Sequence, residues 1–538
     1  MMIIMICHFS IIKPVYLGFV LTLFLSPPPL SAGGTRDNPA PPVRKDRIDI
    51  FRIIISSAGE KPLFKTGPDD TEILILSQLF EGLVGINPET LQIEPALAAS
   101  WEVIDDGKIY RFTLGDKRWS DGSPIKAEEF RSSFVRTLNL GLESPASLYL
   151  SRFILNGEAY VQGSLTDDEL GIRVLPGNVL ELEFTRSYPF ALNLLTHYAF
   201  FLYPPTFFEL KFFDFEALAG IRTSGHYHQG VDEKGKVILL SRDQNPEASG
   251  PERILLLEVR THEDGLKLYL EGKADWLTRG ALPLEKLYDL DYRYDFDNSA
   301  GFMSYFYILN PSRTPLDDPG LRQLLLTSLD REALIDETLR AAQIPSESLV
   351  PPSLYRDHRG PSHPLAGLER SGQLFTADPE WQPLIMIYPT DEGHRILAEA
   401  LISQWEDRGG IPIEGHALDW LDFYKARENG EYHLALGGWS AEYNDPHDFL
   451  SLFLTGERRW GSVYTSPEFD RIILEAESLE NGSDRRSLQR KAEMVLIEDS
   501  LIIPLFFNSL PQLIDRRKWK AGPLRFPGYY SSLKYLHY

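Results

Sequence analysis

Apolar runs alternate with amphipathic stretches in the middle of the chain. Residues 253–259 (RILLLEV) are typical of a strand, residues 262–272 (HEDGLKLYLEG) form a short amphipathic stretch, and residues 274–277 (ADWL) form another apolar run. The pattern indicates a strand, a helix and a second strand.

The same alternation returns later with longer elements. Residues 383–389 (PLIMIYP) and 411–418 (IPIEGHAL) indicate strands on either side of a helix over residues 393–410. Asp419 is a candidate N-cap for a further helix, and residues 432–438 (YHLALGG) indicate a third strand. Strands and helices that alternate at these lengths predict a parallel sheet with crossover connections.

The segment GWSAEYNDPHDFL, residues 438–450, begins where this third strand is expected to end. In open α/β sheets, ligands bind outside the carboxyl ends of the strands. The topology therefore predicts that Trp439 and Glu442 lie at a cleft.

A different pattern precedes these stretches. Residues 108–114 (KIYRFTL) and 179–185 (VLELEFT) indicate strands, and residues 125–138 carry apolar side chains at helical spacing. In WSDGSP, the Asp-Gly pair at 121–122 is typical of a hairpin turn. We expect a separate α+β region here.

The chain has 538 residues, of which 43% are hydrophobic and 12% aromatic. This length exceeds what one core usually covers, so two or three domains are expected. The formal net charge is −23, and no long run of Lys and Arg interrupts it. A nucleic-acid partner is therefore not expected.

The N-terminus carries an apolar core at residues 15–25 (VYLGFVLTLFL), followed by small residues at 31–33. This core is shorter than the roughly 20 residues that span a bilayer of about 30 Å. Residues 1–32 are predicted to be a cleaved secretory signal, with an uncleaved anchor as the alternative. Residues 33–46 resemble a flexible lead-in.

Cys7 is the only cysteine, and it precedes the apolar core. Cleavage would leave none, which excludes disulfides, CxxC redox chemistry, thiolate zinc sites and a cysteine nucleophile. A bacterial lipoprotein would need a cysteine after the core. The sequence therefore predicts a soluble exported protein of the periplasm.

Several quoted segments together resemble one family. They are LFEGLVGINPETLQIEPALAASWEVIDDGKIYRFTLGDKRWSDGSPIKAEEFRSSFVRTL, SPASLYL, LNPSRTPLDDPGLRQLLLTSLDREALI, WSAEYNDPHDFL and YTSPEFDRIILEA. In this order they resemble the extracytoplasmic solute-binding proteins of peptide ABC transporters, and most of all the oligopeptide-binding branch.

This resemblance implies an α/β bilobal periplasmic-binding-protein fold, class II-like with three domains, a hinge and a ligand cleft between the lobes. It implies a monomer without a cofactor that binds oligopeptides and delivers them to permease subunits in the inner membrane. The peptide would lie extended and pair its backbone with strand edges.

By the same resemblance, lobe I is discontinuous and consists of residues 47–93, 213–302 and 508–538. Residues 94–212 form an accessory α+β domain, and residues 303–507 form lobe II.

The resemblance also assigns site residues around the GW segment. Glu442, three residues after Trp439, takes the place of the family's acid that holds the ligand's α-amino group, where related proteins carry aspartate. A carboxylate partly shielded from water makes a charge-assisted hydrogen bond to an ammonium. Gly438 and Ser440 match backbone positions that pair with the peptide, and Trp439 matches a pocket wall.

Other matches lie outside this segment. Trp420 and Arg427 match a pocket tryptophan and a cleft-facing arginine, and Glu81 and Tyr149 match cleft positions. Leu436 stands where the family has a second arginine, which weakens the expectation of a site for a negative ligand terminus. Structural roles remain open for these residues: the tryptophans as core, Arg427 on a solvated helix face and Glu81 as a buried acid.

A metal site formed by Glu442, Asp445, His447 and Asp448 is a further alternative. Neither HExxH nor EF-hand spacing is present. Asp448 also suits the start of a helix, where an acidic side chain interacts favourably with the helix dipole. We expect no metal.

A hydrolase would need an organised nucleophile and base, and the sequence contains no GxSxG motif, so we expect no enzyme activity. Another alternative keeps the fold with a non-peptide ligand, such as a nickel complex, haem, an opine or an oligosaccharide. A receptor or adhesion role on the same scaffold is a further alternative.

Overall fold

The computed structural model describes residues 50–56, 67–212, 217–232, 237–242, 250–283, 286–290, 292–339, 343–355, 382–456, 465–480, 482–520, 525–526, 529–530 and 532–537. The expected signal segment and lead-in lie outside these residues. Within them, no helix has the length and apolar character needed to cross a membrane.

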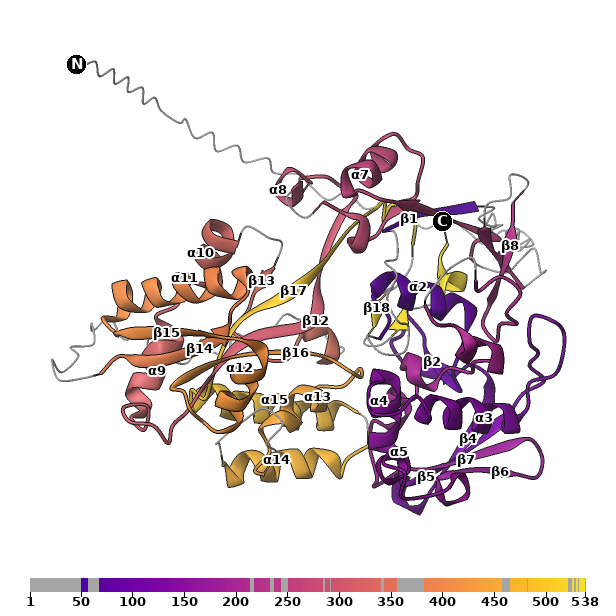
Figure 1. Ribbon diagram of the computed structural model, residues 1–538, viewed down its shortest axis with the longest axis horizontal. Helices are drawn as coiled ribbons and strands as arrows, with labels where there is room; N and C mark the ends of the chain where they lie inside the picture. The colour runs from indigo at the N-terminus through magenta and orange to yellow at the C-terminus, as the bar shows by residue number, and fades with distance from the viewer. Residues whose placement is uncertain are drawn as a thin grey trace, which may run out of the picture. The chain divides into compact units, whose positions relative to one another are not determined.

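An eleven-stranded sheet forms the framework (Figure 1). Its order is β15 (Ile413–Leu418), β14 (Leu384–Pro389), β16 (Leu434–Ser440), β12 (Phe296–Leu309), β17 (Ile502–Ile514), β11 (Trp276–Leu277), β1 (Ile50–Ser56), β10 (Arg253–Val259), β9 (Val237–Ser241) and β8 (Tyr227–Val231), and β13 (Ile344–Pro345) pairs with β17.

The sheet is mixed. Strand β14 is parallel to β15 and β16, and β1 is parallel to β10 and β11, which confirms the predicted crossover units. The prediction of a parallel sheet is wrong at the centre, because β12 and β17 are antiparallel to each other and to their outer neighbours. Two long strands that run side by side in opposite directions need no crossover helix.

Strands β12 and β17 join the two halves of the sheet (Figure 1). Their register shifts between Ala300 and Ser304. A Cβ on Gly301 would lie 2.2 Å from Oδ1 of Asn508, so a larger residue there would force the Asn508 side chain to move. The main-chain N–H of Met303 donates to the same oxygen at 3.1 Å. This irregularity falls beside the expected lobe boundaries, which remain predictions.

Helix α11 (Glu392–Gly409) connects β14 to β15, and α12 (Trp420–Glu428) follows β15. The Asp419 carboxylate accepts a hydrogen bond from the N–H of Asp422 at 2.9 Å, which confirms the predicted N-cap. Strand β16 begins two residues later than predicted and continues to Ser440.

A four-stranded antiparallel sheet confirms the predicted α+β region. Its strands are β4 (Ala98–Ile104), β5 (Ile109–Leu114), β7 (Val179–Glu183) and β6 (Ile172–Leu175). Its helices are α3 (Ala127–Leu138), α4 (Pro145–Phe153), α5 (Gly157–Val161) and α6 (Ala191–Leu194).

Further elements are helices, two-stranded sheets and single turns. They are α2 (Asp70–Leu79), α7 (His262–Leu270), α8 (Leu287–Leu290), α9 (Pro319–Thr327), α10 (Arg331–Ala333), α13 (His447–Leu450), α14 (Pro467–Glu477), α15 (Ser483–Glu498), the pairs β2 (Val84–Ile86) with β3 (Ile93–Pro95) and β18 (Arg525–Phe526) with β19 (Tyr529–Tyr530), and the single turns η3 (Tyr198–Phe200) and η5 (Arg279–Ala281).

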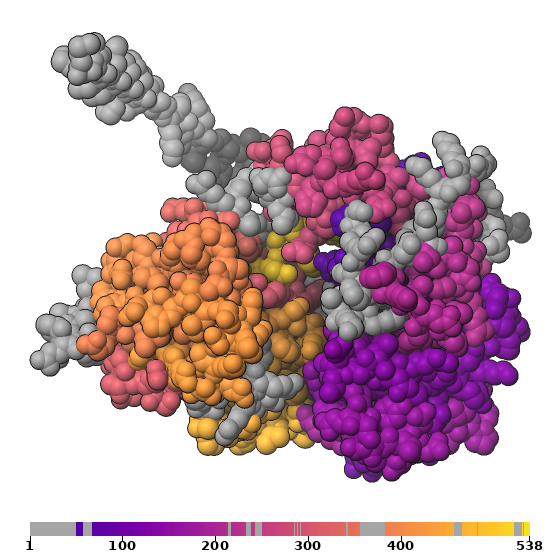
Figure 2. All heavy atoms as spheres, in the orientation of Figure 1, coloured from indigo at the N-terminus to yellow at the C-terminus, as the bar shows by residue number. Residues whose placement is uncertain are grey.

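Separate apolar cores stabilise these regions. One packs around β14, β16 and their helices, one fills the α+β region, and two lie around β1 and β10. Tyr443, from the loop after β16, belongs to the core of the α+β region. Figure 2 shows yellow atoms of the C-terminal part of the chain against purple atoms of that region.

Candidate functional site

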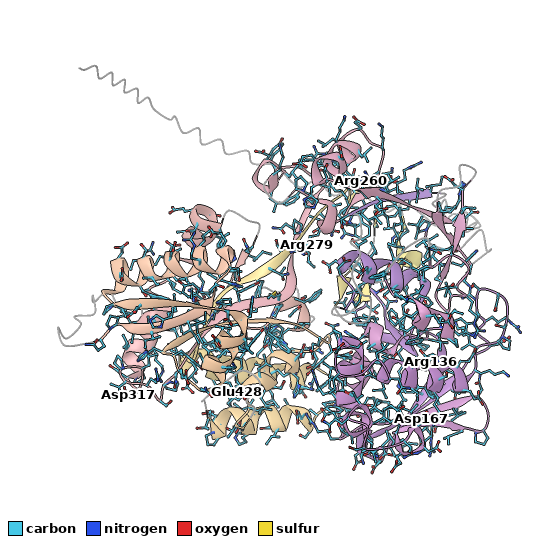
Figure 3. All side chains as sticks on the ribbon, in the orientation of Figure 1. Arg136, Asp167, Arg260, Arg279, Asp317 and Glu428 are labelled. Carbon is cyan, nitrogen blue, oxygen red and sulfur yellow. The ribbon has the colours of Figure 1, made fainter. Side chains whose placement is uncertain are left out.

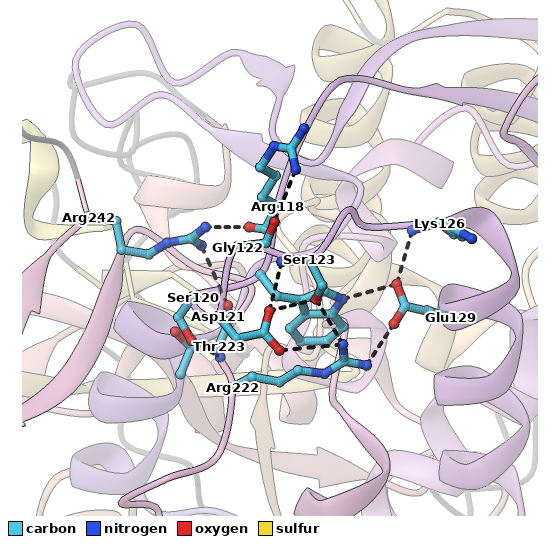
Figure 4. Close-up of polar contacts among 11 residues, drawn as sticks. Arg118, Ser120, Asp121, Gly122, Ser123, Lys126, Glu129, Arg222, Thr223 and Arg242 are labelled. Atoms are coloured by element: carbon cyan, nitrogen blue, oxygen red, sulfur yellow. Dashed lines mark hydrogen bonds and ion pairs between the residues drawn. The ribbon is translucent and has the colours of Figure 1, made fainter.

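The predicted turn in WSDGSP is confirmed, and its role is structural (Figure 4). Gly122 has φ +85°, and Asp121 accepts from the N–H of Ser123 at 2.9 Å. Trp119 is 1% exposed, with the guanidinium of Arg222 4.2 Å from its ring centroid. The turn thereby attaches the α+β region to the segment before β8.

Glu442 lies in the loop after β16, and its carboxylate is paired with an arginine. Oε2 of Glu442 accepts a hydrogen bond from Nη1 of Arg152, on α4. The two side chains are 28% and 32% exposed. Arg152 was missed by sequence reasoning, and the only available signal was its position three residues after Tyr149 on the same helix.

A second carboxyl group lies beside this pair. Asp448 is 3% exposed, and its Oδ2 accepts hydrogen bonds from the N–H groups of Glu442 and, at 3.4 Å, Tyr443. Burial raises the pKa of Asp448 well above its ordinary value, and the negative charge of Glu442 raises it further. Asp448 therefore holds the loop through main-chain hydrogen bonds.

Two tyrosines also face Glu442. Burial raises the pKa of Tyr149 and of Tyr198, and the carboxylate of Glu442 adds to both shifts. Tyr149 is 3% exposed, stacks on His197 with ring centroids 3.9 Å apart, and donates to the carbonyl oxygen of Leu194 at 3.5 Å. The structure thus brings Tyr149 and Glu442 together in one cluster.

The loop is anchored to α15 by a buried ion pair. The Asp445 carboxylate accepts from Nη1 and, at 2.9 Å, from Nη2 of Arg485. It also accepts from Nε2 of Gln489 at 2.8 Å and from the N–H of His447 at 2.9 Å. Among the described residues, no group of three or more His, Cys, Asp or Glu side chains is arranged to hold a metal.

His447 anchors the loop to α14 through Glu477, and its ring lies 4.7 Å from that of Phe190 in the α+β region. Its Nε2 lies 2.5 Å from Oε1 of Glu477, which also accepts from Arg186, with Nη1 2.9 Å from Oε2. Burial alone would raise the pKa of Glu477, but hydrogen bonds with His447 and Arg186 lower it to about 2. Tyr443 stacks on Phe190 with ring centroids 4.9 Å apart. Several contacts besides Arg152 therefore fix the loop.

One edge of β16 is open beside Glu442. Gly438, Trp439 and Ser440 pair with Tyr305, Ser304 and Met303 of β12 on one side. On the other side, β14 pairs only with Leu434 and Ala435. Within the described part of the chain, Gly438 and Ser440 therefore have no strand partner on this side.

Trp420 and Arg427 lie on α12 in different environments. Trp420 is 49% exposed and meets His394 edge-on at 5.8 Å. Arg427 is 5% exposed, with its guanidinium 5.3 Å from the ring centroid of Phe423 and 5.1 Å from that of Tyr424. Burial lowers the pKa of Arg427. The ligand contact expected for Arg427 remains a prediction.

Glu81 follows α2, in a pocket that it shares with Glu94, Lys534 and Tyr535. Its Oε1 lies 3.5 Å from Nζ of Lys534, and its N–H donates to Oγ of Ser224 at 3.2 Å. None of these contacts involves the Glu442 cluster, so the cleft role of Glu81 also remains a prediction.

Residues 92–460 match the family model for bacterial extracellular solute-binding proteins, family 5, middle region. The periplasmic oligopeptide-binding protein OppA of Salmonella typhimurium is 27% identical over 470 residues, which cover 82% of this chain and 84% of the relative. The probable deoxycholate-binding periplasmic protein YgiS of Escherichia coli is 24% identical over 497 residues, covering 87% of this chain and 90% of the relative.

Among solved structures, the unliganded open form of the periplasmic murein tripeptide-binding protein MppA superimposes with a TM-score of 0.78 at 22% sequence identity. The match covers 91% of this chain and 97% of that one. The likeness confirms the expected α/β bilobal fold.

Proposed function

Because the chain belongs to family 5 of the bacterial extracellular solute-binding proteins, we propose that it is the substrate-binding component of an ABC importer. It binds oligopeptides between two lobes and delivers them to the permease subunits. OppA, to which the chain is similar along most of its length, is an oligopeptide-binding protein.

The open edge of β16 is the observation that carries this proposal. An extended peptide pairs its backbone with Gly438 and Ser440, as a strand added to an exposed sheet edge does. Strand β16 runs toward Glu442, so the α-amino end of the peptide lies at that carboxylate and the rest extends back along the strand.

Glu442 has one oxygen available for this contact. Arg152 holds Oε2, while Oε1 has no hydrogen-bond partner among the described residues. An ammonium donates a charge-assisted hydrogen bond to such an oxygen. Trp439 and the half-exposed Trp420 line pockets for peptide side chains.

The remaining properties follow from the same assignment. Residues 1–32 direct export and are removed, and the mature protein works in the periplasm as a monomer. It has no catalytic activity, no cofactor and no nucleic-acid partner. The boundaries proposed for the lobes lie near the β12–β17 irregularity, where a hinge would move one lobe relative to the other.

Calorimetry with a Glu442→Gln variant tests the site. A tripeptide with a free amine should bind the variant about 1.5–3 kcal/mol more weakly, the range for a hydrogen bond to a charged group. The N-acetylated tripeptide should bind wild type poorly and be indifferent to the change. Glu414→Gln, which removes an exposed carboxylate on β15, is the matched control. Equal binding of free and acetylated peptides by wild type would contradict the role of Glu442.

Mass spectrometry of molecules released from the purified protein tests the ligand class. A ladder of short peptides supports the proposal. A single non-peptide species would move the function to the alternative, in which the same fold binds a nickel complex, haem, an opine or an oligosaccharide. The similarity to YgiS, a probable deoxycholate-binding protein, makes this comparison necessary.

A further inference from the structure

Basic side chains gather at one edge of the main sheet. At this edge β12 begins and β17 ends, because Phe296 pairs with Leu513, and β11 begins there too, because Trp276 pairs with Ile514. Strand β1 is parallel to β11 and therefore begins on the same side. The segment DRRKWK, residues 515–520, leaves β17 at this edge. The edge thus collects side chains from β1 and from the C-terminal part of the chain.

The cations of this edge are more exposed than the carboxylates with which they pair. The side chain of Arg517 is 66% exposed, whereas that of Asp515, 3.1 Å away, is 26% exposed. Asp275 is 12% exposed and pairs with the more exposed Arg52 at 3.4 Å and Lys518 at 3.8 Å. A surface that approaches this edge therefore meets positive charge first, with the carboxylates beneath it.

Two tyrosines project beside these cations. Tyr294 is exposed, and the guanidinium carbon of Arg517 lies 3.5 Å from its ring centroid. Tyr292 is 84% exposed, and the side chain of Lys520 is exposed as well. Tyrosine has an apolar ring with a polar hydroxyl, which suits the boundary between water and lipid headgroups. We call these residues together the basic patch: Arg52, Arg517, Lys518, Lys520, Tyr292 and Tyr294.

The basic patch contrasts with the acidic chain as a whole, whose formal net charge is −23. Residues 515–520 carry four basic side chains and one acidic, and residues 44–49 (RKDRID), which precede β1 in the sequence, carry three basic and two acidic. Exposed charges farther away than about 10 Å are largely screened at 0.1 M salt. An anionic surface in contact with this edge is therefore attracted by the patch although the whole protein is acidic.

We propose that the basic patch docks the protein on an anionic lipid membrane. Each Lys or Arg that reaches such a surface strengthens binding by about fivefold. Separate cations on a broad sheet edge fit a fluid bilayer, whose headgroups move to each charge, better than one small anion. The proposed export places the protein beside a membrane. Docking goes beyond peptide binding, and it would keep the protein close to the permease subunits that it is proposed to serve.

Vesicle co-sedimentation of the exported protein, without residues 1–32, tests the proposal. Removing this segment excludes binding through its apolar core. Vesicles of phosphatidylcholine with about 30% phosphatidylglycerol should bind the protein at least about tenfold more tightly than vesicles of phosphatidylcholine alone, and raising the salt from about 0.05 M to about 0.5 M should abolish the difference. The double variant Arg517→Gln/Lys520→Gln should bind the anionic vesicles about twentyfold more weakly than wild type.

The matched control is Lys117→Gln/Arg136→Gln, which removes the same charge from exposed side chains of the α+β region. Figure 3 shows Arg136 on α3, away from the start of β1. This control should bind both kinds of vesicle as wild type does. Circular dichroism verifies that each variant is folded, and calorimetry with a peptide should give wild-type affinity for Arg517→Gln/Lys520→Gln.

Four outcomes would overturn the proposal. The protein shows no preference for anionic vesicles, or Arg517→Gln/Lys520→Gln binds them as wild type does. Alternatively, both double variants lose the same affinity, which would assign the effect to net charge. Finally, the protein binds immobilised polyglutamate but not anionic vesicles, and the partner of the patch is then an acidic polypeptide. Failure to bind any peptide would instead contradict the proposed function, and vesicle binding is measured independently of it.

Discussion

Replacing Arg152 with glutamine should strengthen the binding of peptides that carry a free α-amino group. Arg152 occupies one oxygen of Glu442, and the ligand's ammonium is expected on the other. Because both groups are cations bound to the same carboxylate, Arg152 competes with the ligand. The loop that carries Glu442 does not depend on Arg152, since Asp445, His447 and Tyr443 anchor it independently.

The magnitude follows from Coulomb's law. Two cations on opposite oxygens of a carboxylate lie about 5 Å apart, and at an effective dielectric constant of about 20 they repel by roughly 3 kcal/mol. The side chains of Arg152 and Glu442 are about a third exposed, so solvent screening reduces this repulsion to roughly 1–1.5 kcal/mol. The expected gain in affinity is therefore about tenfold.

Calorimetry of wild type and Arg152→Gln with a free-amine tripeptide and its N-acetylated form measures this effect. Only the free amine should bind more tightly to the variant. Arg152→Lys, which keeps the charge, should behave like wild type. Weaker binding of the free amine to Arg152→Gln would refute the reasoning, because Arg152 would then position Glu442 rather than compete for it.

Three further changes test how the site is supported. Asp445→Ala should lower the free energy of unfolding by about 3–5 kcal/mol in urea titrations, because it leaves the buried Arg485 without its carboxylate. Gly437→Ala should destabilise by about 1–3 kcal/mol, since the new Cβ would lie 2.4 Å from the ring of Phe306. Glu477 has a pKa lowered from 4.5 to about 2, so its contribution to stability is complete above pH 4.5 and disappears as the pH falls through 2. The thermal unfolding temperature of Glu477→Gln should therefore fall less than that of wild type as the pH drops from 4.5 to about 2.

Each of these three predictions has an outcome that would contradict it. A loss below 1 kcal/mol in Asp445→Ala would show that Arg485 finds another partner. Gly438→Ala is the control for Gly437→Ala, because its Cβ would meet Met303 at an ordinary 3.4 Å and should cost less. An unchanged acid dependence in Glu477→Gln would assign the effect to other carboxylates.

The sequence by itself determined the local elements around the site. The N-cap at Asp419, the helix between β14 and β15, and the loop that begins after β16 were all predictable, because caps and periodicity depend on residues a few positions apart. The family resemblance, carried by motifs in order along the chain, identified Glu442 as a candidate before any geometry was known.

Only the tertiary structure decided what surrounds those residues. The sheet is mixed because β17 returns from the C-terminal part of the chain to pair with β12, a contact that no local pattern encodes. Arg152 meets Glu442 across 290 positions of the chain, and Arg485 meets Asp445 from α15. Pairings between distant residues depend on how whole elements pack, so the charges beside a predicted ligand contact become visible only in the folded chain.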